Sequence, residues 1–172
     1  PLVSVIMSVY NGEKYLVQAI DSILNQTYQN FEFIIIEDCS TDNSLDILEE
    51  YAKKDSRIKI IKKEKNIGIK GFIENLNLGI SIAKGKYIAR MDQDDVSLPE
   101  RFQKQVDFLE NNPEITLVGA QLNLINEQNK ITGEAIAALQ HRDIVKRITS
   151  QIQLFHPVIM FRKDQNIQYR EK

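Results

Sequence analysis

Residues 31–43 read FEFIIIEDCSTDN, an isoleucine-rich apolar run that turns abruptly polar. An apolar run of this kind is typical of a central parallel strand, because helices cover both faces of such a strand. The polar residues that follow indicate a turn. A buried strand that ends in a polar loop is the repeating unit of an α/β sheet.

Similar units recur along the chain. Valine and methionine alternate with other side chains along residues 3–9, which predicts a first strand that Asn11-Gly12 ends. Further strands are predicted at 57–62 and 87–91. Apolar residues at helical spacing predict amphipathic helices between and after the strands. These helices are expected around Tyr15–Leu24, Leu45–Ala52, Phe72–Ala83 and Phe102–Leu109. This alternation predicts one α/β domain with a mostly parallel sheet.

Local signals refine this scheme. Gly85 follows a predicted helix, where a C-terminal cap belongs. Residues Ser97–Glu100 have the spacing of a capping box for the next helix. In the last third, we expect a strand over 115–125, a short helix over 144–148 and a final strand over 158–161.

Composition excludes several classes of protein. The 172 residues are 42% hydrophobic and 27% charged, which is ordinary for a soluble domain, and the net charge of −2 argues against nucleic acid as a partner. No apolar stretch reaches the ~20 residues of a membrane helix. Cys39 is the only cysteine, which suits a reducing compartment. We therefore expect a cytoplasmic protein, including one bound peripherally at the inner face of a membrane.

Polar side chains follow three of the predicted strands. Tyr10 comes after the first strand, Asp38 after the second, and Asp92, Asp94 and Asp95 after the fourth. Ligands of open α/β sheets bind beyond the carboxyl ends of the strands, so these loops are expected to converge on one site. Carboxylates this close together repel one another, so they need a cation or many hydrogen-bond donors to stay ionised. Hard oxygen ligands of this kind suit Mg²⁺ or Mn²⁺.

Each of these residues also has a plain structural interpretation. The acidic loop is equally consistent with a solvated segment near a helix N-terminus. Tyr10 is an aromatic that either covers the end of the core or packs on a planar base. Residues 40–42 suit turn and cap positions, whereas Asp38 lies where a carboxylate can accept a hydrogen bond from a nucleobase imide.

The order of motifs resembles that of the family 2 glycosyltransferases. The matching segments are Val3–Asn11, Ser22–Tyr28, Phe31–Asp42, Asn66–Gly68, Asn77–Gly79, Ala83–Gly85 and Arg90–Asp95. The resemblance implies a GT-A fold, which is a Rossmann-like three-layer α/β/α sandwich. It also implies inverting transfer of a sugar from a nucleotide-sugar, usually a UDP-sugar, to an acceptor hydroxyl. The acceptor would be a glycan or lipid-linked molecule in polysaccharide or cell-surface glycan synthesis.

The resemblance also assigns roles to residues. It implies that Tyr10 and Asp38 contact the base and that Asp92 lies by the ribose and diphosphate. Asp94, with Asp92 beside it, would hold Mg²⁺ or Mn²⁺, and Asp95 would support the site without touching the metal.

The chain departs from the family pattern near its end. Residues 155–162 resemble the segment that precedes the family's catalytic Glu-Asp pair, but no such pair follows Asp95. We therefore expect residues 1–172 to be a donor-binding domain whose catalytic base lies beyond Lys172. A nucleotide-sugar-binding module without transferase activity is the alternative. A sugar nucleotidyltransferase would need a glycine-rich phosphate loop after the first strand, which residues 10–13 do not form.

Overall fold

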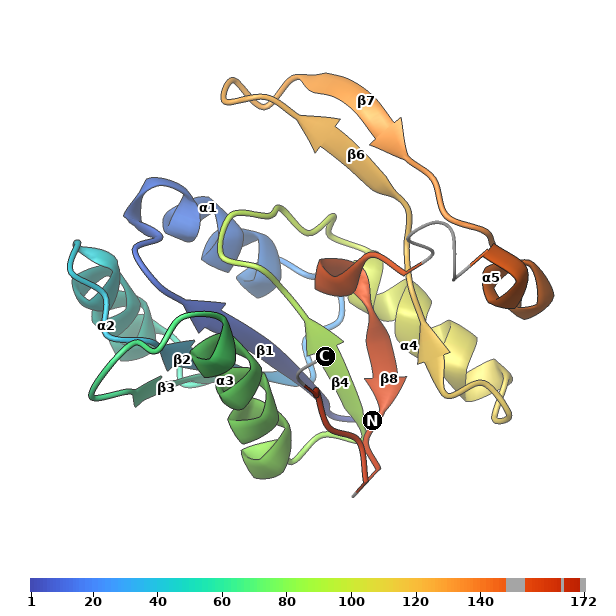
Figure 1. The fold of residues 1–172 in the computed structure, drawn as a ribbon, viewed down its shortest axis with the longest axis horizontal. Coiled ribbons are helices and arrows are strands. Elements are labelled where there is room, and N and C mark those ends of the chain that lie inside the picture. Colours follow the sequence, from blue (N-terminus) through green and yellow to red (C-terminus); the bar gives the residue numbers. More distant parts are fainter. Residues whose placement is uncertain (148–153, 165, 171–172) are drawn as a thin grey trace.

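A six-stranded sheet with the strand order β3-β2-β1-β4-β8-β5 forms the centre of the computed structural model of this chain (Figure 1). The structure describes residues 1–147, 154–164 and 166–170. The elements are β1 (Val3–Val9), α1 (Glu13–Leu24), β2 (Phe31–Glu37), α2 (Ser44–Lys54), β3 (Ile58–Lys62), α3 (Ile69–Ile82), β4 (Tyr87–Arg90), α4 (Arg101–Asn111), β5 (Leu117–Val118), β6 (Leu122–Ile125), β7 (Ile131–Ala135), α5 (His141–Arg147), the 3-10 turn η1 (His156–Val158) and β8 (Met160–Arg162).

The first four strands of the chain are parallel neighbours. β1 pairs with β2 on one side and with β4 on the other, and β3 pairs with β2. β8 runs antiparallel to both β4 and β5. The prediction of a mostly parallel α/β sheet is confirmed.

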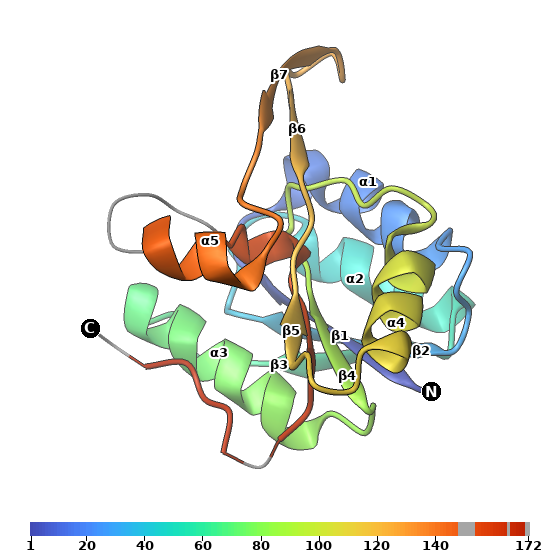
Figure 2. The same ribbon diagram turned by 90° about the vertical axis from the view of Figure 1, so that its right-hand side faces the viewer.

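Helices cover both faces of the sheet (Figure 2). On one face, Leu16 of α1, Leu48 of α2 and Phe102 of α4 join one buried cluster with side chains of β1 and β2. On the other face, Leu76 and Ile80 of α3 pack against alternate residues of the same strands. The predicted three-layer α/β/α arrangement is therefore confirmed. Within the described parts of the chain, no helix combines the length and the apolar character needed to cross a membrane.

β2 is buried along its whole length, which explains the apolar run in its sequence. Phe33 and Ile35 belong to the cluster under α1, α2 and α4, whereas Ile34 and Ile36 belong to the cluster under α3. Burial of each such side chain stabilises the fold by about 1.5–3 kcal/mol. Of the two acidic residues in this strand, Glu32 and Glu37, the first accepts hydrogen bonds from the Ser4 hydroxyl and the Lys84 amide, both at 2.6 Å.

The predicted capping box is wrong. α4 begins at Arg101, after Glu100, and no side chain caps it. Ser97 is buried instead, and its hydroxyl accepts from Gln26 at 3.2 Å and from Arg101 at 3.4 Å. These tertiary contacts hold the loop that precedes the helix, so they replace the local cap.

The predicted role of Gly85 as a helix cap is also wrong. α3 ends at Ile82 with Ala83 as its C-cap. Gly85 lies where the chain passes close to the start of β1, and its amide donates to the Ser4 hydroxyl at 2.8 Å. A Cβ atom at this position would lie 2.6 Å from the Ser4 nitrogen and 2.8 Å from the Leu2 oxygen. The position therefore needs glycine for close backbone approach.

The last third of the chain differs most from the prediction. The strand expected over 115–125 is two strands, β5 in the main sheet and β6 in a separate hairpin with β7. β7 was not predicted, because it is mostly exposed and Ile131 is its only large apolar side chain. The final strand begins at Met160, two residues later than expected. The short helix is α5, and the expected Ile148 position lies outside the described residues.

The β6–β7 hairpin projects from the body of the domain in both Figures 1 and 2. Two polar contacts connect its tip to α1. Lys14 forms an ion pair with Glu127 at 2.6 Å, and Gln18 donates to the side-chain oxygen of Asn129 at 3.2 Å. Both contacts are exposed, so each is expected to contribute little to the stability of the fold.

Gly85→Ala should destabilise the domain by about 1–3 kcal/mol, because the added methyl group meets main-chain atoms that cannot rotate away. Urea unfolding measures the change. The matched control is Gly133→Ala in the hairpin, where a Cβ would lie 3.6 Å from the nearest side-chain atom. This control should change stability by less than about 0.5 kcal/mol. Equal effects of the two substitutions would contradict the close packing of Gly85 on β1.

Candidate functional site

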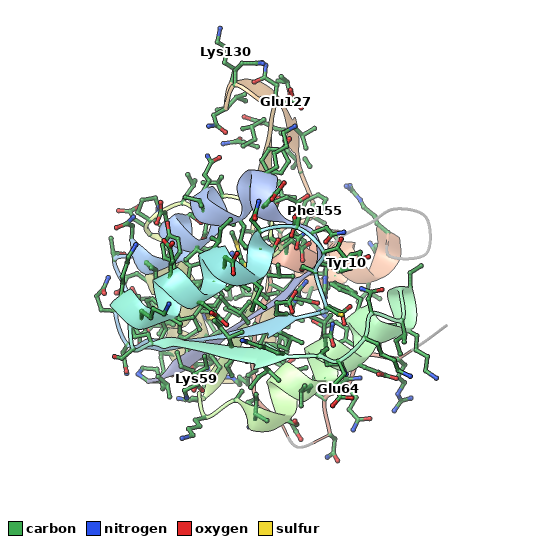
Figure 3. The ribbon with its side chains drawn as sticks, turned by 90° about the vertical axis from the view of Figure 1, so that its left-hand side faces the viewer. Tyr10, Lys59, Glu64, Glu127, Lys130 and Phe155 are labelled. Carbon is green, nitrogen blue, oxygen red and sulfur yellow. The ribbon has the colours of Figure 1, made fainter. Side chains whose placement is uncertain are left out.

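A pocket of about 380 Å³ opens where β1, β2 and β4 end. It is lined by Ser8, Tyr10, Asp38, Asn66, Gly68, Ile69, Phe72, Asp92, Gln93 and Asp94. The four residues predicted to bind a ligand, Tyr10, Asp38, Asp92 and Asp94, thus line one pocket. Figure 3 shows Tyr10 and Glu64 at the edge of the sheet where β1, β2 and β3 end.

Hydrogen bonds join the loops after β1 and β2. Asn11 adopts a left-handed conformation with φ 50°, and its side-chain oxygen accepts from the Thr41 amide at 2.8 Å. The Asn11 amide donates to the Ser40 hydroxyl at 3.1 Å. Asp42 accepts from the Ser44 amide at the start of α2 and from the Glu13 amide, each at 3.0 Å. Residues 40–42 lie in the turn before α2, as expected, whereas the N-cap of α2 is Asn43, which makes no side-chain cap hydrogen bond.

Gln93 holds the main chain of Tyr10 from both sides. The Tyr10 amide donates to the Gln93 side-chain oxygen at 2.8 Å, and the Gln93 amide group donates to the Tyr10 oxygen at 3.0 Å. A Cβ on Gly12 would lie 2.8 Å from that side-chain oxygen, so glycine leaves room for this contact. Tyr10 remains 43% exposed at the pocket, with its position fixed through its main chain.

Asp38 is a buried acceptor in the pocket wall. Its side chain is 3% exposed, and Oδ2 accepts from the Asn66 amide group at 2.8 Å. Among the described residues, Oδ1 has no hydrogen-bond partner. A buried carboxylate oxygen without a donor is unfavourable by about 1–3 kcal/mol or more. The pocket therefore favours a ligand with an N–H or O–H group at this point.

The acidic loop concentrates negative charge beside Asp38. Asp92 and Asp94 line the pocket, and the side chain of Asp92 is 34% exposed. Asp95, next in the chain, is partly buried. Burial raises the pKa of Asp95 to about 6, and the charges of Asp92 and Asp94 add to this shift. The loop therefore favours any cation that approaches it.

Two buried arginines lie beneath this loop. Arg101 donates to the main-chain oxygen of Arg90 at 2.5 Å. Burial lowers the pKa of Arg101 to about 9, as does the nearby charge of Arg90, so Arg101 still carries its proton at neutral pH. Arg90 is 1% exposed and forms an ion pair with Asp92. Together the two arginines offset part of the negative charge of the acidic loop.

His156 in η1 lies beside Arg90. Its Nδ1 atom is 3.5 Å from Nη2 of Arg90. Burial lowers the pKa of His156 to about 4, and the charge of Arg90 adds to this, so the imidazole is neutral at pH 7. Because a guanidinium only donates, Nδ1 must accept and the ring proton is assigned to Nε2. The ring meets that of Tyr169 edge-on, with centroids 5.1 Å apart.

The donor set suits a divalent cation that completes its coordination with ligand oxygens. Within the described residues, no group of three or more His, Cys, Asp or Glu side chains could enclose a metal ion. Asp92 and Asp94 supply two carboxylates on one pocket wall. Mg²⁺ typically uses one or two carboxylates together with substrate phosphates. The residues therefore fit a metal held between protein and phosphate, and the metal assignment stays a prediction.

Several residues of the site received no role from the sequence. Asn66, Arg90 and Gln93 stand within quoted motifs, but only the fold shows that they hold Asp38, Asp92 and Tyr10 respectively. An arginine that ends an apolar strand is a signal that could have drawn attention to Arg90. His156 is 66 residues away from Arg90 in sequence, and no local pattern connects the two.

The sequence of this α/β domain matches a family of sugar-transferring enzymes. The sequence profile described as Glycosyl transferase family 2 matches residues 4–169. The match covers nearly all of the chain, so this chain belongs to glycosyl transferase family 2.

Curated relatives agree with this assignment. An uncharacterized glycosyltransferase from Haemophilus influenzae is 50% identical over 74% of this chain and 39% of its own length. The O-antigen biosynthesis glycosyltransferase WbnJ of Escherichia coli is 41% identical over 95% of this chain and 62% of its own length. The match spans 39% and 62% of the length of these two relatives, so this chain corresponds to only part of each.

Two solved structures show the same fold. Staphylococcus aureus TarS 1–349, in complex with UDP-GlcNAc, has a TM-score of 0.70 and 24% identity, over 95% of this chain and 46% of that one. The mannosyltransferase PcManGT from Pyrobaculum calidifontis, in complex with GDP-Man and Mn²⁺, has a TM-score of 0.66 and 16% identity, over 93% of this chain and 44% of that one. At these identities the likeness concerns the fold.

Proposed function

We propose that this chain is the donor-binding domain of a glycosyltransferase that uses a UDP-sugar and inverts the configuration of the transferred sugar. The acceptor is a hydroxyl of a glycan or lipid-linked molecule, in line with the name of the O-antigen relative. The observation that carries this proposal is the unpartnered Oδ1 of Asp38 in a pocket that Tyr10, Asp92 and Asp94 also line.

The base-binding end of the pocket is formed by Tyr10 and Asp38. The imide N–H of uracil is a donor that fits Oδ1 of Asp38, whereas the corresponding ring nitrogen of cytosine is an acceptor that a carboxylate repels. Asn66 holds Oδ2, so the rotation of the Asp38 carboxylate is already restricted before ligand arrives. The exposed ring of Tyr10 offers a surface on which a planar base packs. These features support recognition of uridine.

The acidic loop forms the phosphate end of the pocket. A diphosphate beside Asp92 and Asp94 is repelled unless a cation lies between them. We propose that Asp94, assisted by Asp92, holds Mg²⁺ or Mn²⁺ there, and the metal supplies Lewis-acid stabilisation of the departing diphosphate. The complex of PcManGT with Mn²⁺ supports a metal in this fold. Asp95 supports the loop without touching the metal.

Transfer also needs a base for the acceptor hydroxyl. A direct displacement inverts the sugar, and a positioned carboxylate takes the hydroxyl proton. The carboxylates that line the described pocket, Asp38, Asp92 and Asp94, already have roles in donor binding. No Glu-Asp pair follows Asp95 in the sequence, and the relatives are longer than this chain. We propose that residues beyond Lys172 supply the base.

Two substitutions distinguish the role of the base-binding end of the pocket from that of the phosphate end. Asp38→Ala should reduce the preference for UDP over CDP by about 10- to 100-fold, because it removes a charged acceptor for the imide N–H. Asp94→Ala should abolish the tightening of UDP binding by Mn²⁺ and keep the base preference. Calorimetry with UDP and CDP, with and without Mn²⁺, measures both effects.

The control is Asp46→Ala, an exposed carboxylate in the first turn of α2. It should leave both the base preference and the Mn²⁺ effect unchanged. Identical, metal-independent losses for Asp38→Ala and Asp94→Ala would show that this division of roles is wrong.

The position of the base is tested by chain length. A version extended by the next few dozen native residues should release UDP from a UDP-sugar, with saccharide acceptors present, faster by about 10²–10⁴-fold than residues 1–172. Equal turnover in both would place the base within these residues, with Asp143 and Asp164 as the candidates. Tight UDP binding without turnover in either version would favour a binding module over a transferase.

A further inference from the structure

Arg90 is a buried charged side chain in the layer between the sheet and α3. It is 1% exposed and pairs in register with Ile6 of β1, on the face of the sheet that α3 covers. A buried ion is weak evidence for stability, because apolar residues of similar volume often stabilise a fold as well. The reason for this charge is therefore expected in its contacts.

Three contacts fix the plane of the Arg90 guanidinium. Nη1 donates to the main-chain oxygens of Ile6 and Met91, both at 2.9 Å. The guanidinium also lies over the ring of Phe72 in α3, 5.5 Å from its centroid. With the plane fixed, Nη2 reaches Oδ1 of Asp92. The Asp92 side chain stays 34% exposed, and Asp92 lines the donor pocket.

His156 approaches the same nitrogen of Arg90 from another part of the chain. The pairing of β8 with β4 brings η1 next to Arg90, whose amide donates to the Ile159 oxygen at 3.0 Å. Nδ1 of His156 lies 3.5 Å from Nη2, and the ring is held between Phe72 and Tyr169. The neutral imidazole thus limits the rotation of Arg90 without opposing its charge.

We propose that Arg90 is a positioning residue that orients Asp92 toward the donor diphosphate, and that His156 keeps Arg90 in place. This inference rests on the proposed function, since it concerns the donor site. Asp94 and Asp95 repel Asp92, and the Arg90 ion pair offsets this repulsion. Without it, the partly exposed Asp92 side chain turns toward solvent and no longer faces the phosphates.

The test compares UDP binding with and without Mn²⁺ in the native chain, Arg90→Met, Asp92→Asn and the double variant. Arg90→Met should weaken the Mn²⁺-dependent part of UDP affinity by about tenfold, and leave binding without Mn²⁺ within about twofold. In the Asp92→Asn background, Arg90→Met should have no further effect. Arg90→Lys should recover part of the loss, because it restores the charge.

His156 is tested in the same assay. His156→Ala should cause a smaller loss in the same direction, and His156→Gln should recover part of it, because its amide oxygen accepts from Arg90. His141→Gln is the matched control, since His141 is exposed on α5 and far from Arg90 in sequence. It should leave UDP affinity unchanged.

Additive losses for Arg90→Met and Asp92→Asn would overturn the positioning role, as would unchanged UDP affinity in Arg90→Met. If Arg90→Met does not fold, Arg90→Lys carries the test: equal factors of loss in the native and Asp92→Asn backgrounds overturn the proposal. These results leave the proposed function intact when the native chain binds UDP. Absence of UDP binding by the native chain with Mn²⁺ would overturn the proposed function and this inference with it.

Discussion

The parallel pairing of β1 with both β2 and β4 is the constraint on which the site depends. Val9 lies opposite Glu37 in the β1–β2 register, so Tyr10 and Asp38 leave the sheet side by side. Ile6 lies opposite Arg90 in the β1–β4 register, which brings the acidic loop to the same edge. A shift of one residue in either pairing would turn each side chain to the opposite face and separate these groups.

The balance of charge beneath the pocket follows from the same arrangement. β4 is short and ends at Arg90. The Arg90 side chain is buried between the sheet and α3, whereas Asp92 reaches the pocket. Arg90 and Arg101 offset only part of the charge of the three carboxylates Asp92, Asp94 and Asp95. The loop thus retains an excess of negative charge, which is the condition for attracting a divalent cation together with phosphate.

Much of this could be predicted from sequence, because the signals are local. The apolar run of β2 shows its burial on both faces, and the polar residues after β1, β2 and β4 mark the pocket edge. The errors arose where tertiary contacts decide the outcome. Gly85 is required by its approach to β1, and β7 has only one large apolar side chain because it lies in an exposed hairpin. The contact of His156 with Arg90 depends on a pairing between distant strands.

The central claim is that the pocket at the ends of β1, β2 and β4 binds a uridine diphosphate donor. A crystal structure of the chain with UDP and Mn²⁺ tests it most directly. The account predicts that the uracil imide nitrogen lies within hydrogen-bonding distance of Oδ1 of Asp38, that the base packs on Tyr10, and that the diphosphate faces Asp92 and Asp94. A base placed away from Asp38, or UDP bound outside this pocket, would contradict it.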